Sequence, residues 1–288
     1  MTSPLPIATH VFMLTWWLTQ QVTGLTQSKL DMAYNAFDDQ YEGCIQEMEK
    51  KAPQLLNEEL KINEQLKSEW AEAKEHWEQI KYKIKRPKNF NDFHGIALVA
   101  YTGSISKDFN TAVREFRQNS NNFKYKAFHY YLTRALQLLK EQNCHLYHVY
   151  RGTHTKFYYS GEHSVRFGQF TSSSWELTEA LQFYSEGGTL FKINTCLGVY
   201  IKAFSLYPDE EEVLIPGYEV YKKVAIKQTD KYTEITLKDP QRQRSNYNCF
   251  YVSKNPSNFN SSGMIKGAEF LVLLLPNLLI LLLLYAEL

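Results

Sequence analysis

The hydrophobic pattern of the chain changes its period near residue 144. Before this point, apolar residues recur every three or four positions, which is the spacing of an amphipathic helix. After it, they alternate in short runs that Gly, Pro or Asp residues bound, which is typical of β-strands. Because helices come first and strands second, the sequence predicts an α+β fold rather than a doubly wound α/β fold.

The first half contains several predicted helices. The pattern over 43–84 indicates helix, and we expect Pro53 to break it in two, since proline lacks the N–H that a helix interior requires. Further helices are predicted at 93–101, 109–116 and 123–139. Their stripes of aromatic residues and leucine indicate a packed core.

The second half carries the strand signals. The runs predicted as strands are 148–151, 164–174, 189–201, 211–226, 232–237 and 246–252. The sequence contains no Gly-x-Gly-x-x-Gly turn, so a dinucleotide would not be held in the Rossmann manner.

The first residues predict secretion. Residues 11–18 form an apolar core that is too short to span a bilayer, and small residues follow at 22–24. We therefore expect 1–24 to be a signal peptide, with a buried N-terminal helix as the alternative.

The last residues predict a lipid anchor at the outer face of the plasma membrane. Residues 270–285 are almost wholly apolar, and a short spacer separates them from small residues at 260–263. This order indicates a glycosylphosphatidylinositol attachment signal over 260–288, with a plain tail anchor as the alternative. The attachment residue stays open among Asn260, Ser261 and Ser262. Between the two signals we expect a mainly helical lobe at 25–143 and a β-rich lobe at 144–259.

The cysteines and the charge fit an extracellular domain. Cys44, Cys144, Cys196 and Cys249 are expected to form two disulfides, for which three connectivities are possible. None of them is spaced like a zinc-ligand pair and no His cluster accompanies them, so we expect no metal. The net charge is +1, which gives no indication of a nucleic-acid partner.

An acidic run precedes one of the predicted strands. Glu210 and Glu212 would lie on one face of that strand, about 6 to 7 Å apart, because side chains alternate along a strand. Two such carboxylates raise the pKa of one another and can divide the work of stabilising a cation and accepting a proton. Taken alone, such a run is more typical of a solvated acidic turn.

Two further motifs come earlier in the chain. Arg151 ends a predicted strand and Gly152 follows it, a combination that can hold a phosphate close to the backbone. Ser172 belongs to a hydroxyl cluster at the end of another strand. Each motif alone has an ordinary explanation, a structural salt bridge for the first and a helix cap for the second.

The ordered set of arginine, serine and Glu-x-Glu is more specific than any of its members. In its flanking segments, too, the chain resembles the vertebrate ecto-mono-ADP-ribosyltransferases, most of all their T-cell ecto-ADP-ribosyltransferase 2 branch. The segments that carry this resemblance are 92–95, 97–103, 126–136 and 212–220.

The resemblance implies a fold and a reaction. The fold would be that of the ADP-ribosyltransferases, with the helical lobe packed on a mixed or antiparallel β-sandwich that binds NAD. NAD would be the co-substrate, and arginine side chains of cell-surface or secreted proteins would accept ADP-ribose. The resemblance also implies that Cys44 pairs with Cys249 and Cys144 with Cys196.

It implies residue roles as well. Glu212 would stabilise the ribosyl cation left by nicotinamide, as a glycosidase carboxylate does. Arg151 would hold the diphosphate, and Ser172 would orient Glu212 or the nicotinamide ribose. Gly152 would offer its backbone to the nicotinamide amide, and Phe183 would stack on the nicotinamide ring.

Glu210 would decide the acceptor. A carboxylate beside a guanidinium can direct one nitrogen toward the anomeric carbon and take its proton. We therefore expect an arginine transferase with some NAD hydrolysis as a side activity. The alternatives are an enzyme that is mainly an NAD glycohydrolase and a catalytically silent, lipid-anchored surface antigen.

Overall fold

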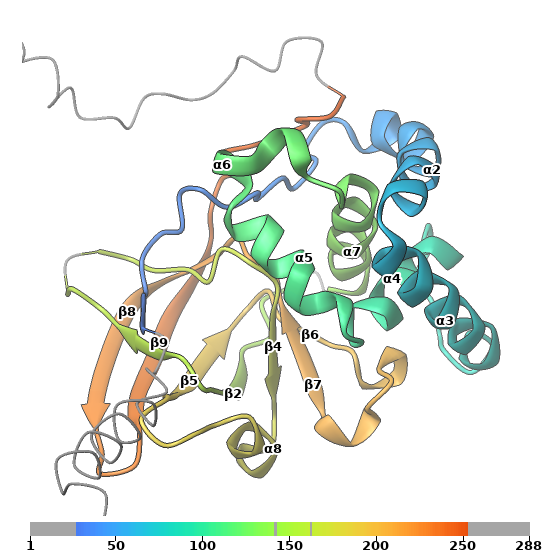
Figure 1. Ribbon diagram of the computed structural model, residues 1–288. Coiled ribbons are helices and arrows are strands. Elements are labelled where there is room, and N and C mark those ends of the chain that lie inside the picture. The colour runs from blue at the N-terminus through green and yellow to red at the C-terminus, as the bar shows by residue number, and fades with distance from the viewer. Residues whose placement is uncertain (1–26, 141–142, 162, 253–288) are drawn as a thin grey trace, which may run out of the picture. The chain divides into compact units, whose positions relative to one another are not determined.

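The computed structural model describes residues 27–140, 143–161 and 163–252, which belong to one compact unit ending at Val252 (Figure 1). The predicted signal peptide and the predicted anchor signal lie outside these residues. Among the helices of these ranges, none combines the length and the hydropathy that a membrane span requires.

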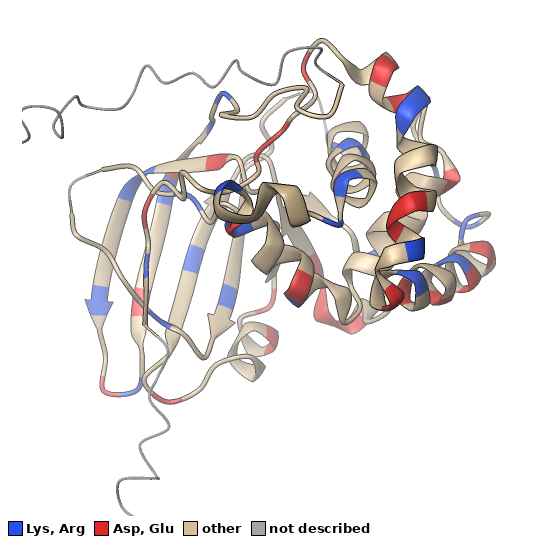
Figure 2. Cartoon of the chain, turned by 45° about the horizontal axis from the view of Figure 1, so that its top comes forward, with Lys and Arg blue, Asp and Glu red and all other residues tan. Residues whose placement is uncertain are grey.

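Helices make up the first half of the described chain, as predicted. They are α2 (Ile45–Ile62), α3 (Glu64–Ile80), α4 (Asp92–Tyr101), α5 (Ile105–Arg114), α6 (Phe116–Asn119), η1 (Ser120–Asn122) and α7 (Lys126–Leu139). Residues of both charge signs are interspersed over the helices (Figure 2), and among them Lys67 pairs with Glu64 at 3.1 Å, one turn apart.

The prediction that Pro53 separates two helices is wrong. Pro53 lies inside α2, and the break falls at Asn63, where the backbone is extended. The Asn63 side chain caps α3 by accepting the N–H of Leu66 at 3.0 Å. The buried face of α2 continues past the proline from Met48 to Leu56, so its packing outweighs the one lost hydrogen bond.

The second half forms a mixed sheet, as predicted. Its seven strands are β2 (Tyr147–Thr153), β4 (Thr171–Ser174), β5 (Thr189–Thr195), β6 (Val199–Tyr200), β7 (Glu212–Ile215), β8 (Glu219–Gln228) and β9 (Thr233–Arg242). Their spatial order is β6-β7-β4-β2-β5-β9-β8, and every pair is antiparallel except β5 with β9. A second, two-stranded parallel sheet joins β1 (Gln27–Lys29) to β3 (Lys156–Tyr158).

Several predicted strands are shorter than expected. The run 211–226 is divided by Pro216 and Gly217 into β7 and β8, and the run 164–174 is strand only in β4. The run 189–201 is interrupted after β5. The prediction of a strand at 246–252 is wrong. Backbone N–H groups of that segment bond instead to the carboxylates of Asp38 and Asp39.

The large sheet is buried on both faces near β7. Leu214 belongs to the core shared with the helices, which also contains Trp77 and Phe128. Its neighbour Val213 belongs to a second core with Phe191, against which Phe157 of β3 also packs. Adjacent residues of β7 therefore pack in different cores, because side chains alternate along a strand. This packing holds Glu212, the first residue of β7, where the helical half meets the sheet.

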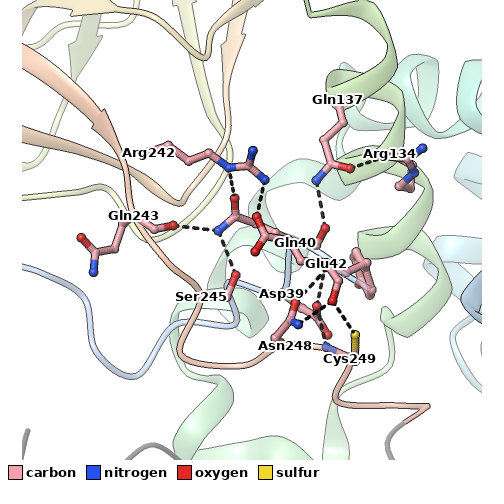
Figure 3. Close-up of polar contacts among 11 residues, drawn as sticks. Asp39, Gln40, Glu42, Arg134, Gln137, Arg242, Gln243, Ser245, Asn248 and Cys249 are labelled. Carbon is pink, nitrogen blue, oxygen red and sulfur yellow. Dashed lines mark hydrogen bonds and ion pairs between the residues drawn. The ribbon is translucent and has the colours of Figure 1, made fainter. Parts of the chain in front are cut away.

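A disulfide and hydrogen bonds join residues 39–44, near the start of the described chain, to residues 243–249, near its end (Figure 3). Cys44 is bonded to Cys249, and the carboxylate of Asp39 accepts the N–H of Cys249 at 3.0 Å. Gln40 donates to the carbonyl of Gln243 at 2.8 Å. A second disulfide joins Cys144 to Cys196, next to β2 and β5.

Candidate active site

A cavity of about 730 Å³ opens between the helical half and the large sheet. Its walls come from α4, α5, β2, β4 and β7, from η3 (Pro208–Glu210) and from α8 (Leu177–Gln182), which packs on β2 and β4. The cavity brings together all the residues that the sequence predicts for the site, namely Arg151, Gly152, Ser172, Phe183, Glu210 and Glu212.

Arg151 projects from the middle of β2. Its Nη1 donates to the carbonyl of Ser172 on β4 at 2.7 Å, so the two neighbouring segments hold the guanidinium in place. Burial lowers the pKa of Arg151, while Tyr101 and Glu212 nearby raise it. The guanidinium nevertheless stays charged, because arginine does not lose its proton within proteins.

Glu212 is the first residue of β7 and is paired with Ser174 of β4. Only 4% of it is exposed. Burial raises the pKa of Glu212 to about 7. A hydrogen bond from Ser172 lowers this pKa, Glu210 raises it and Arg151 lowers it, in that order of size.

Glu210 reaches the same cavity by a different route from the one predicted. The observed strand β7 begins at Glu212 and does not include Glu210. Glu210 is instead the last residue of η3. Between them Glu211 adopts the left-handed conformation, with φ 49° and ψ 47°. This turn, rather than strand alternation, places both carboxylates at the cavity. Burial raises the pKa of Glu210, and the nearby carboxylate of Glu179 raises it further.

Gly152 is required by close packing. A Cβ at this position would lie 2.0 Å from the carbonyl oxygen of Ala180 in α8. The sequence prediction attributed this glycine to the approach of a ligand, whereas the close neighbour in the structure is α8. Any other residue at position 152 would push α8, and the cavity wall that it forms, away from β2.

Two aromatic side chains stand exposed at the cavity. Phe183 follows α8 and is 49% exposed, and Tyr207 precedes η3 and is 55% exposed. Large apolar side chains with this exposure at a cavity are available to stack on a flat ligand group.

The sequence prediction missed lining residues that come from the helical half and from loops. Asn110 donates to the hydroxyl of Tyr101 at 3.0 Å, and both are buried beside Arg151. Within the described part of the chain, Oδ1 of Asn110 and Oε1 of Gln169 have no hydrogen-bond partner. Both residues line the cavity, although the two oxygens themselves are buried. Tyr101 and Asn110 lie in segments that the sequence predicts only as helices, so the helical period gave no signal that they line a cavity.

The described residues contain no group of three or more His, Cys, Asp or Glu side chains that could hold a metal ion. The ionisable side chains that line the cavity are those of Lys107, Arg114, Arg151, His154, Glu179, Glu210 and Glu212, besides tyrosines.

Known proteins resemble this chain in sequence and in fold. A family model described as NAD:arginine ADP-ribosyltransferase matches residues 30–245. T-cell ecto-ADP-ribosyltransferase 1 of Rattus norvegicus is 64% identical over 245 residues, covering 84% of this chain and 87% of that protein. T-cell ecto-ADP-ribosyltransferase 2 of Rattus norvegicus is 59% identical over 280 residues, covering 96% and 97%. A mutant of the eukaryotic mono-ADP-ribosyltransferase ART2.2, solved in complex with NAD, superimposes with a TM-score of 0.74 and 61% identity, over 77% of this chain and 99% of that chain.

Proposed function

Because this chain belongs to the family of NAD:arginine ADP-ribosyltransferases, we propose that its cavity transfers ADP-ribose from NAD to arginine side chains of proteins outside the cell. The enzyme class, the use of NAD and the ADP-ribosyltransferase fold follow from the family and from the likeness to ART2.2. The observation that carries the residue assignment is the meeting of Arg151, Ser172, Glu210 and Glu212 at one cavity.

Glu212 acts on the bond that breaks. The bond between C1′ of the ribose and the nicotinamide nitrogen cleaves, its electron pair leaves with neutral nicotinamide, and a ribosyl cation remains. An ionised, buried Glu212 stabilises this cation more strongly than a solvated carboxylate could, because the surroundings screen it less. Ser172 holds Glu212 through its hydrogen bond.

Arg151 and the cavity wall orient NAD. The guanidinium of Arg151 would pair with the diphosphate, which favours a planar fork of N–H donors. The exposed ring of Phe183 would stack on nicotinamide, while Gly152 would offer its backbone to the nicotinamide amide.

Glu210 selects arginine as the acceptor. A guanidinium nitrogen attacks C1′, a new C–N bond forms, and the proton that this nitrogen loses passes to Glu210. Glu179 also lines the cavity and lies near enough to Glu210 to raise its pKa. Two carboxylates here would attract a cationic side chain, since each favours the charged form of the guanidinium.

The place of action is the cell surface. The names of both T-cell relatives contain "ecto", and the sequence of this chain carries a secretory signal pattern and a terminal anchor pattern. We expect a glycosylphosphatidylinositol anchor, so phosphatidylinositol-specific phospholipase C should release the enzyme from intact cells. Retention of all activity on treated cells would indicate a protein tail anchor instead.

The test of the activity uses a soluble form, residues 25–259, which contains the whole described unit. It is incubated with NAD labelled on the adenylate and with agmatine. We expect labelled agmatine from the wild type. Glu210→Gln should lose transfer by about a hundredfold and keep NAD hydrolysis, whereas Glu212→Gln should lose both. Glu186→Gln, an exposed carboxylate outside the cavity, serves as the matched control.

The other outcomes are equally informative. Free ADP-ribose with no labelled agmatine would identify an NAD glycohydrolase, and untouched NAD would identify a silent surface antigen. Equal loss of both activities in Glu210→Gln would contradict the division of roles between the two carboxylates.

A further inference from the structure

Glu211, between the two cavity carboxylates, has a backbone conformation that residues with a Cβ rarely adopt. The turn around it is tight. The N–H of Glu211 donates to the carbonyl of Pro208 at 3.4 Å, and that of Glu210 to the carbonyl of Tyr207 at 3.1 Å. Such a conformation persists only where its surroundings hold it in place.

The Glu211 side chain is held away from the cavity, which it does not line. One carboxylate oxygen accepts a hydrogen bond from the hydroxyl of Tyr200 at the end of β6. The other pairs with Nζ of Lys202, which begins η2 (Lys202–Phe204). Neither Tyr200 nor Lys202 lines the cavity either. The hydrogen bond from Lys202 and then that from Tyr200 lower the pKa of Glu211, so its carboxylate is ionised at neutral pH.

Trp175, which follows β4, holds the same residue from another side. The backbone N–H of Trp175 donates to the backbone carbonyl of Glu211 at 3.3 Å. Its ring stacks on that of Tyr200, with centroids 4.1 Å apart and an interplanar angle of 26°. Segments from both neighbours of β7 therefore fix the turn. These residues form what we call the turn clamp: Trp175, Tyr200, Lys202 and Glu211.

The clamp matters more for Glu210 than for Glu212. Glu212 is held in the sheet by its pairing with Ser174. Glu210 lies on the other side of the left-handed residue, and among the described residues no hydrogen bond holds its carboxylate. The position of Glu210 relative to Glu212 therefore depends on the turn.

We propose that the turn clamp positions Glu210 beside Glu212 and thereby decides whether the ribosyl cation reacts with arginine or with water. This inference rests on the proposed function. With the clamp loosened, Glu212 and Arg151 still promote loss of nicotinamide, but Glu210 no longer meets the guanidinium. Water then forms the new C–O bond at C1′ and releases its proton to solvent. The clamp residues are positioning residues, since none of Tyr200, Lys202 and Glu211 lines the cavity.

The experiment measures two products of one enzyme. The full-length chain, displayed on cells, is given NAD and agmatine, and labelled agmatine and free ADP-ribose are quantified per surface copy. In Glu211→Ala, transfer should fall by at least about tenfold while NAD hydrolysis stays within about twofold, because a misplaced acceptor group costs rate in transfer alone. Tyr200→Phe should shift the ratio in the same direction by less. Lys202→Ala should behave like Glu211→Ala, and Lys202→Arg should restore transfer.

Lys223→Ala, at an exposed lysine of β8, is the matched control and should change neither product. Tyr200→Phe removes one oxygen only, so it keeps the test decisive if Glu211→Ala does not reach the surface. If these variants lower transfer and hydrolysis by the same factor, or change neither, the inference is overturned. A wild type that hydrolyses NAD without modifying agmatine overturns the proposed function, and the inference with it.

Discussion

At the scale of single residues, the carboxyl group of Glu212 lies buried at the cavity, and burial disfavours its charged form. The pKa of Glu212 is raised from 4.5 to about 7, with burial as the largest cause. The folded state therefore binds a proton at Glu212 more tightly than the unfolded chain does. The resulting contribution to stability is fully present below pH 4.5 and is lost as the pH rises through 7.

This sign gives a pH-dependent prediction for Glu212→Gln. Glutamine has nearly the same shape and carries no charge, so the variant should gain up to roughly 3 kcal/mol in the free energy of unfolding at pH 8. Below pH 4.5 the gain should vanish. Urea unfolding at both values measures it. Asp39 and Glu59 also have raised pKa values, but they titrate alike in both proteins and cancel in the comparison. Equal stability changes at both pH values would contradict the prediction.

At the scale of elements, a side-chain cap and the packing of a buried face set the boundary between α2 and α3, and Pro53 does not. α2 runs through Pro53 because its buried face is continuous, and it ends where Asn63 can cap the next helix. The first turn of α3 depends on that cap, since the leading N–H groups of a helix have no partner within it.

Asn63→Ala should therefore lower the free energy of unfolding by about 1 kcal/mol, because the N–H of Leu66 loses its acceptor. Asn57→Ala is the matched control. Asn57 is exposed inside α2, where alanine is the better helix former, so this variant should be neutral or slightly stabilising. Thermal unfolding followed by circular dichroism measures both, and the same sign for the two variants would contradict the capping argument.

At the scale of the whole molecule, segments far apart in sequence meet around one buried carboxylate. Asp38 pairs with Arg166 at 2.7 Å, and each side chain is only 1% exposed. Asp38 also accepts the N–H groups of Asn246 and Tyr247, at 2.9 and 3.0 Å. One side chain thus joins the start, the middle and the end of the compact unit.

Asp38→Ala should be strongly destabilising, by roughly 3–5 kcal/mol, because it leaves the charge of Arg166 buried with only the carbonyls of Met32 and Ala33 and no carboxylate beside it. Adding Arg166→Met should recover part of the loss. The control is Glu42→Ala, which removes an ion pair to Arg242 of equal length, 2.7 Å, but with both side chains about half exposed. That loss should stay below about 1 kcal/mol. Similar losses in the two single variants would show that burial of the pair does not govern its contribution.

The sequence by itself determined the fold class and the family, and it named four residues that the structure brings to one cavity. The change of period near residue 144 separated helices from strands, because each structure imposes its own spacing on apolar residues. The ordered motifs named Arg151, Ser172, Glu210 and Glu212 and, through the resemblance, the family that the comparisons confirm. The roles of these residues stay predictions that the proposed assays test.

Only the tertiary structure decided how these residues meet. The sequence prediction placed Glu210 and Glu212 on one strand, whereas a left-handed residue held by Tyr200 and Lys202 turns both toward the cavity. Asn110 and Gln169 are ordinary polar residues in the sequence and become part of the cavity lining only where the helices meet the sheet. The physical reason is common to these cases. Periodicity reports the contacts of residues near in sequence, while the conformation of a turn and the lining of a cavity depend on side chains that arrive from distant segments.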